Sequence, residues 1–222
     1  IHWPKDEQGL PSYKLEALTA ANGIEHQGAH DALVDVRATI ALARLIRDKQ
    51  PKLFEYALSM RSKDKVRDAI ALGSGKPVFH VSGMFGNAQY CSSVVLPLCQ
   101  HPTNSNAIVC FDLRHDPAPL LELSAEEIRH RVFSKADTLE GYERVALKSI
   151  HVNKCPMVAP VAMVNETVAE RIGMDLSVIR QNYDQLSQAL NHAVIEKISA
   201  VFSPQVETST AVVDVDAALY TG

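Results

Sequence analysis

The hydrophobic pattern of this 222-residue chain changes from a helical to a strand-like period near residue 75. Before that point, apolar residues fall on one face of a helix, as in the stripe of Val34, Ala38, Leu42 and Leu45. After it, short runs rich in β-branched residues are bounded by Gly, Pro, Asn and Asp, which is typical of strands. Four strands are predicted, at about 76–82, 93–100, 106–113 and 145–153. The pattern therefore predicts an α+β chain.

Helices are predicted on both sides of these strands. The first covers residues 12–22, with Ser12 as its cap and Gly23 in the left-handed position that ends it. Ser124 followed three residues later by Glu127 is the capping-box pattern, so another helix starts there. The remaining predicted helices cover 31–49, 52–72, and the stretch from 165 to about 202, with a break at Gly173.

The distribution of helices and strands predicts three segments. Residues 1–50 contain no predicted strand, and two helices with one apolar stripe each cannot build a large core. This segment is therefore expected to need a partner sheet from outside itself. Residues 51–203 are predicted to form a β-rich domain with inserted helices. Residues 204–222 have no strong periodicity and are predicted to be a linker.

Charge is unevenly spread along the chain. The net charge is −4, yet the segment from Arg37 to Lys76 holds ten Lys and Arg against four Asp and Glu, a local balance of +6. Such a stretch can form a surface for a phosphate backbone or an acidic peptide. The alternative interpretation is an ordinary solvated helix face, since Lys and Arg are mostly exposed in any protein.

The composition is that of an ordinary globular protein, with 46% hydrophobic and 22% charged residues. No apolar run reaches the roughly 18 residues of a membrane span, and the first residues do not form a signal peptide. The four cysteines are irregularly spaced, which favours a reducing, cytoplasmic setting. Zinc binding by these cysteines with His80 or His101 is a minor alternative, because the spacing fits no common zinc motif.

A histidine and an aspartate near residue 30 are the candidate catalytic pair. His30 stands where a loop meets a predicted helix, and Asp35 lies inside that helix. Asp is a poor residue for a helix interior, so this carboxylate either caps something or serves a site. The His could act as a general base on water and the Asp could hold a divalent metal. The spacing alone is weak evidence, because His26 and Asp31 repeat it, and acidic residues are common at helix N-termini.

The residues HDALVD fit the pattern H-x-A-x-x-D, the last motif of 3′→5′ exonucleases that use four acidic residues and a catalytic His. The longer string NGIEHQGAHDALVDVRATIALARLI resembles bacterial exonuclease I (exodeoxyribonuclease I), a family that digests single-stranded DNA. The strings KPVFHVSGMFG, LPLCQHPTNSNAIVCFDL, PLLEL, IHVNKCP and VDAALYTG resemble the same family in the same order. The resemblance thus covers nearly the whole chain.

The resemblance implies a fold, a chemistry and partners. The fold would be the C-terminal helices of a ribonuclease H-like exonuclease domain followed by an SH3-like β-barrel domain. His30 matches the general base and Asp35 the last metal-binding carboxylate of a site with two Mg²⁺ ions. The activity would release 5′-mononucleotides from single-stranded DNA in repair and recombination. Tyr56 and Lys76 match part of a surface that binds DNA or the C-terminal tail of the single-stranded-DNA-binding protein, and a monomer is expected.

The sequence also departs from the family pattern. The other carboxylates of the family, a D-x-E and a later Asp, have no match here, since the adjacent Asp6 and Glu7 lack a strand context. One carboxylate cannot hold two Mg²⁺ ions, so a fragment limited to these residues is predicted to be inactive. Several polar positions in 160–187 differ from the family, which puts tail docking in question. Two alternatives stay open: a non-catalytic module that binds single-stranded DNA or protein, and a purely structural domain.

Overall fold

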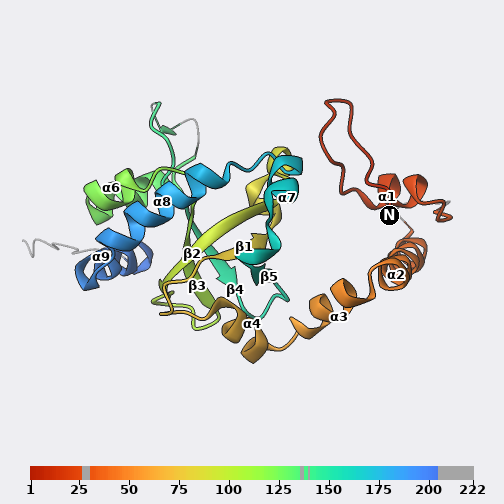
Figure 1. Ribbon diagram of the computed structural model, residues 1–222, viewed down its shortest axis with the longest axis horizontal. Helices are drawn as coiled ribbons and strands as arrows, with labels where there is room; N and C mark the ends of the chain where they lie inside the picture. Colours follow the sequence, from red (N-terminus) through yellow and green to blue (C-terminus); the bar gives the residue numbers. More distant parts are fainter. Residues whose placement is uncertain (27–30, 136–137, 140, 205–222) are drawn as a thin grey trace, which may run out of the picture.

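The strand-like runs form one antiparallel sheet with helices on both of its faces (Figure 1). A computed structural model of the chain describes residues 1–26, 31–135, 138–139 and 141–204. Within it, α1 and α2 lie at one end, and α6, α8 and α9 lie at the other (Figure 1). The α+β class is confirmed, and the predicted barrel is formed as a five-stranded antiparallel sheet.

The sheet has the strand order β4-β3-β2-β1-β5, so β4 and β5 are its edges. The four strands predicted from the sequence are present, three with shorter ends and β2 beginning one residue earlier, and β5 was missed. Only four residues long and ending in Pro160, β5 carries little strand signal, and an edge is where a sheet tolerates proline. The strands are β1 (Val78–Val81), β2 (Ser92–Gln100), β3 (Ala107–Asp112), β4 (Leu147–His151) and β5 (Met157–Pro160).

Both faces of the sheet are buried, which explains why β2 and β3 have almost no exposed residue. Successive side chains of a strand point to opposite faces. Accordingly, Val94 and Leu96 join a core beneath α6, α8 and α9, whereas Val95 joins a second core beneath α4. The β-rich part is therefore a three-layer arrangement with the sheet in the middle.

Four helices precede the sheet. The helix predicted over 52–72 is wrong in one respect, because it is two helices separated at Met60–Ser62. The Ser62 side chain accepts a hydrogen bond from the Lys65 amide and starts the second one. Ser12 is not a cap either, since α1 begins after Lys14 and Ser12 is buried. The helices are α1 (Leu15–Ala21), α2 (Ala32–Lys49), α3 (Pro51–Ser59) and α4 (Lys63–Ile70).

The later helices follow their predicted caps more closely. The Ser124–Glu127 capping box is confirmed, and Gly173 separates two helices with φ +60°. The predicted continuous run to 202 is interrupted after Ala189, where Asn191 caps a new helix. The helices are α5 (Ala118–Glu122), α6 (Ala125–Phe133), α7 (Glu166–Arg171), α8 (Leu176–Ala189) and α9 (His192–Phe202), with short 3-10 turns η1 (Gly83–Phe85), η2 (Asn87–Gln89) and η4 (Val161–Met163). In the described part of the chain, no helix has both the length and the apolar character needed to cross a bilayer.

Candidate functional site

The first turn of α2 carries two aspartates with different roles. Asp31 is the N-cap, and its Oδ1 accepts hydrogen bonds from the amides of Leu33 at 2.9 Å and Val34 at 3.3 Å. These contacts satisfy amides that have no partner within the helix. Helix capping thus explains why an aspartate stands at position 31. The aspartate at position 35, one turn later, needs another explanation.

Asp35 contacts a histidine that the sequence spacing had linked to Asp31. The His26 Nε2 atom lies 2.7 Å from Asp35 Oδ1. The His26 imidazole is 6% exposed, whereas the Asp35 side chain is 42% exposed. On its other edge, His26 Nδ1 lies 3.3 Å from the hydroxyl of Thr19, a fully buried residue of α1. The contact joins residues nine apart in the sequence, a separation that no helical or strand period would have indicated.

His30, the predicted general base, lies outside the described residues. The metal-binding role predicted for Asp35 rests on one carboxylate, a hard oxygen donor of the kind that Mg²⁺ prefers. Among residues 1–26, 31–135, 138–139 and 141–204, no group of three or more His, Cys, Asp or Glu side chains could hold a metal ion. Asp35 therefore fits one position in a Mg²⁺ shell, and further carboxylates would have to complete it. The four cysteines are all free.

The basic segment from Arg37 to Lys76 runs over α2, α3 and α4 (Figure 1). All of its charged side chains are exposed. Two of these cations have acidic neighbours: Arg47 Nε lies 2.9 Å from Asp48, and Arg67 Nη1 lies 3.6 Å from Asp64. The local excess of positive charge remains on the surface and can attract an anionic polymer. All ten basic residues are exposed: Arg37, Arg44, Arg47, Lys49, Lys52, Arg61, Lys63, Lys65, Arg67 and Lys76.

Tyr56 and Lys76 both lie beside the β1–β5 pair. The Tyr56 hydroxyl donates a hydrogen bond of 2.8 Å to the carbonyl of Val158 in β5, and burial raises the pKa of the phenol. Lys76 is exposed two residues before β1, in a turn whose Gly75 carbonyl accepts a 3.0 Å bond from Tyr183 of α8. Tyr56 thus lies at the sheet edge formed by β5 with its hydroxyl already engaged, whereas Lys76 lies in the segment that leads into β1.

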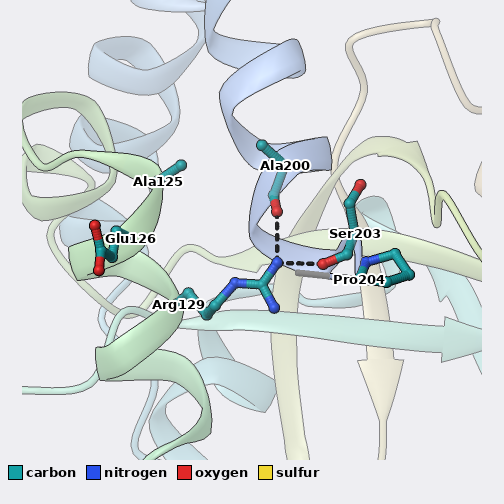
Figure 2. Close-up of a pocket in the computed structure, with 6 residues that line it drawn as sticks. All are labelled: Ala125, Glu126, Arg129, Ala200, Ser203 and Pro204. Atoms are coloured by element: carbon teal, nitrogen blue, oxygen red, sulfur yellow. Dashed lines mark hydrogen bonds between the residues drawn. The ribbon is translucent and has the colours of Figure 1, made fainter. Parts of the chain in front are cut away.

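A surface pocket lies between α6 and α9, on the opposite side of the sheet from α2 (Figures 1 and 2). Its cation, Arg129, turns toward the end of α9, where Nη2 donates to the carbonyls of Ala200, at 2.8 Å, and Ser203. Because the guanidinium is used in these internal bonds, we interpret this pocket as a structural junction. Its lining residues are Ala125, Glu126, Arg129, Ala200, Ser203 and Pro204.

Sequence comparison connects these features to one group of nucleases. Residues 61–204 match the family model of the Exonuclease I SH3-like domain. Exodeoxyribonuclease I of Escherichia coli (strain K12) is 42% identical over 222 residues, which are 100% of this chain and 46% of that protein. The chain spans about half the length of the curated relatives it matches.

Solved structures give the same result. E. coli Exonuclease I in complex with a dT13 oligonucleotide has a TM-score of 0.87 at 42% identity, with 92% of this chain and 44% of that chain covered. The zinc-bound form of the E. coli enzyme with single-stranded DNA has a TM-score of 0.86 at 42% identity, covering 92% and 43%. A crystal structure of SSB/Exonuclease I with the inhibitor CFAM has a TM-score of 0.82 at 40% identity, covering 93% and 43%. Since the matched residues 61–204 contain the whole five-stranded sheet, this chain belongs to the exonuclease I SH3-like domain family.

Proposed function

We propose that this chain is part of a 3′→5′ exodeoxyribonuclease specific for single-stranded DNA, which releases 5′-mononucleotides and acts in DNA repair and recombination. The observation that carries the proposal is the 42% identity to E. coli Exodeoxyribonuclease I along the entire chain. The likeness extends to structures of that enzyme with single-stranded DNA. A cytoplasmic, monomeric enzyme is expected.

Residues 1–50 would be the C-terminal part of the exonuclease domain, 51–203 the SH3-like domain, and 204–222 the linker to a further, helical domain. A second apolar stripe on α2 supports this division: Leu33 is 57% exposed, Val36 54% and Ile40 45%. These residues share one helix face, opposite the stripe of Val34, Ala38, Leu42 and Leu45. A helix that is apolar on two sides lies between two layers, so we propose that the remainder of the exonuclease domain covers the exposed stripe.

The proposed chemistry divides between two residues of this chain. Asp35 would hold a Mg²⁺ ion, and His30 would accept the proton of the attacking water. Two bound Mg²⁺ ions would supply water activation and stabilisation of the leaving oxygen. Because Asp35 alone cannot complete octahedral shells, a polypeptide limited to these 222 residues would have no nuclease activity.

Two binding roles are proposed for the surface. The exposed cations between Arg37 and Lys76 would contact the DNA backbone. Tyr56 and Lys76 would contribute to docking the acidic tail of the single-stranded-DNA-binding protein, in line with the existence of an SSB/Exonuclease I structure. The stretch 160–187, where polar positions differ from the family, covers η4, α7 and most of α8, and tail docking is least expected there.

The test is digestion of a 5′-labelled single-stranded oligonucleotide by the protein expressed from the whole reading frame. A Mg²⁺-dependent ladder shortening from the 3′ end is expected. Asp35→Asn and His30→Ala should each lower the rate by at least about 100-fold, since each removes a group from the reacting centre. Glu196→Gln, an exposed acid on α9 outside the basic segment, is the control and should keep full activity.

The competing function is a non-catalytic module that binds single-stranded DNA or protein. The observation that favours it is the fully exposed basic segment, which needs no metal site to bind DNA. An oligonucleotide that binds with strong salt dependence but is never shortened by the whole protein would support the module and overturn the nuclease.

A further inference from the structure

We propose that His26 is a positioning residue for Asp35: its imidazole holds the carboxylate in the orientation that binds the metal ion. The inference rests on the proposed function, because it takes Asp35 as a metal ligand. It goes further by assigning a role to a histidine outside the H-x-A-x-x-D pattern. The geometry that points to it is the 2.7 Å contact between His26 Nε2 and Asp35 Oδ1.

The two neighbours of the imidazole fix its orientation. A carboxylate can only accept a hydrogen bond, so the proton must be on Nε2. On the other side of the ring, His26 Nδ1 lies 3.3 Å from the Thr19 hydroxyl oxygen. That hydroxyl also lies 2.9 Å from the carbonyls of Leu15 and Glu16, which keeps it in place on α1. Thr19 therefore limits rotation of the His26 ring and keeps Nε2 facing Asp35.

The two side chains differ in exposure, which separates the supporting residue from the one that can meet a metal ion. His26 is buried behind the carboxylate at 6% exposure, whereas Asp35 keeps 42% of its side chain accessible. A buried histidine that donates to one oxygen of a partly exposed carboxylate can fix its rotation while leaving it approachable from solvent. This is how hydrogen-bonding groups behind metal ligands orient them, and removing such a group costs 10–100-fold in metal affinity or activity.

The pair also bridges two elements that would otherwise contribute separately to the site. His26 follows α1, and Asp35 lies in the first turn of α2, which Asp31 caps. A merely structural bridge between the helices would affect stability and leave metal binding unchanged. The two roles can therefore be separated by measuring each property.

The experiment uses the protein expressed from the whole reading frame, with His26→Ala, His26→Gln and a control, His192→Ala. His192 forms a comparable contact with an acid, Glu196, at 3.4 Å on the exposed surface of α9. The readouts are Mn²⁺ affinity by calorimetry without DNA, the Mg²⁺ concentration for half-maximal digestion, and the melting temperature without metal. His26→Ala should weaken Mn²⁺ binding by 10–100-fold and raise the Mg²⁺ requirement. The Gln amide nitrogen can reach the position of Nε2, so His26→Gln should restore most of the affinity, and His192→Ala should equal wild type.

Mn²⁺ affinity within twofold of wild type in His26→Ala would overturn the positioning role, whatever happens to the melting temperature. If His26→Ala does not fold, His26→Gln is compared with His26→Asn, whose shorter amide cannot reach Asp35. Equal Mn²⁺ affinities of these two variants would overturn it as well. Failure of the proposed function is distinguishable, because then Asp35→Asn itself would leave metal binding and digestion intact.

Discussion

Tyr56 of α3 donates its hydroxyl to the main-chain carbonyl of Val158 at 2.8 Å, which fixes the basic helices to the edge strand β5. The two residues are 102 positions apart, and the ring packs against the core beneath α4. Tyr56 therefore has a structural role of its own, in addition to any contact with a partner.

Tyr56→Phe separates these two roles. Loss of the hydroxyl should lower the free energy of unfolding by about 1 kcal/mol, the usual net value of one hydrogen bond. Binding of an acidic tail peptide should change little if the partner uses the ring face, which Phe retains. The measurements are urea unfolding and peptide titration. Tyr142→Phe, on an exposed tyrosine whose ring lies 4.5 Å from the Arg131 guanidinium, is the control and should leave stability unchanged.

His80 should make the SH3-like domain less stable in mild acid. The residue is 7% exposed in β1, and burial lowers its pKa despite a 3.0 Å hydrogen bond from Nδ1 to the Met157 carbonyl. As the pH falls below the unfolded pKa near 6.5, His80 binds a proton in the unfolded chain but stays neutral in the folded one. Stability should therefore be complete above about pH 7 and decline until the lower, folded pKa is reached.

The pH dependence can be assigned with His80→Asn, whose amide nitrogen can take the place of Nδ1 but does not titrate. Unfolding free energies at pH 7.5 and pH 5.5 are compared for the two proteins. The wild type should lose more stability between these values than the variant. Other histidines, including His101, are common to both proteins and cancel in the difference. Parallel pH profiles would contradict the role of His80.

Ser93 and Asp112 form a buried pair between β2 and β3. Both are almost fully buried, and the Ser93 hydroxyl donates to Asp112 Oδ1, which also accepts the Arg114 amide at 3.1 Å. Ser93→Ala would leave a buried carboxylate with one donor fewer. We expect a loss of about 1.5–3 kcal/mol in the free energy of unfolding, the range for hydrogen bonds to charged groups. Ser187→Ala, on the exposed face of α8, should stay within about 0.5 kcal/mol of wild type in the same measurement.

Sequence patterns predicted correctly those features of the fold that depend on interactions between residues close in the chain. The capping box at Ser124 and the limits of α2 depend on residues within one or two turns, and both were found as expected. By contrast, β5 exists because Val78–Val81 offers it an edge to pair with, and nothing in Met157–Pro160 alone indicates this. The His26–Asp35 contact was missed for the same reason, since it is set by how α1 packs on α2. The family motif predicted a role for Asp35, and the folded chain adds its contact with His26.

Arg129 should control how firmly the end of α9 is attached to the domain. Its Nη2 donates to the Ala200 and Ser203 carbonyls, and these groups lie at the C-terminus of α9, where the helix leaves carbonyls unpaired and carries partial negative charge (Figure 2). Arg129→Met keeps the apolar stem and removes the donors. A loss of about 2 kcal/mol in unfolding free energy is expected. Amide exchange in the last turn of α9 should become faster than in wild type, whereas exchange in β2 should not change.

Arg131→Met is the matched control for this change, because Arg131 lies on the same helix but stacks on exposed Tyr142. A cation over an exposed ring contributes about 0.5–1 kcal/mol, so the control should cost at most half as much and leave α9 exchange unchanged. Arg129→Lys discriminates further: a lysine keeps the charge near the helix end but loses the planar donor geometry of the guanidinium. An intermediate loss would show that both charge and geometry matter. Equal losses for Arg129→Met and Arg131→Met, with no change in α9 exchange, would contradict the attachment of α9 through Arg129.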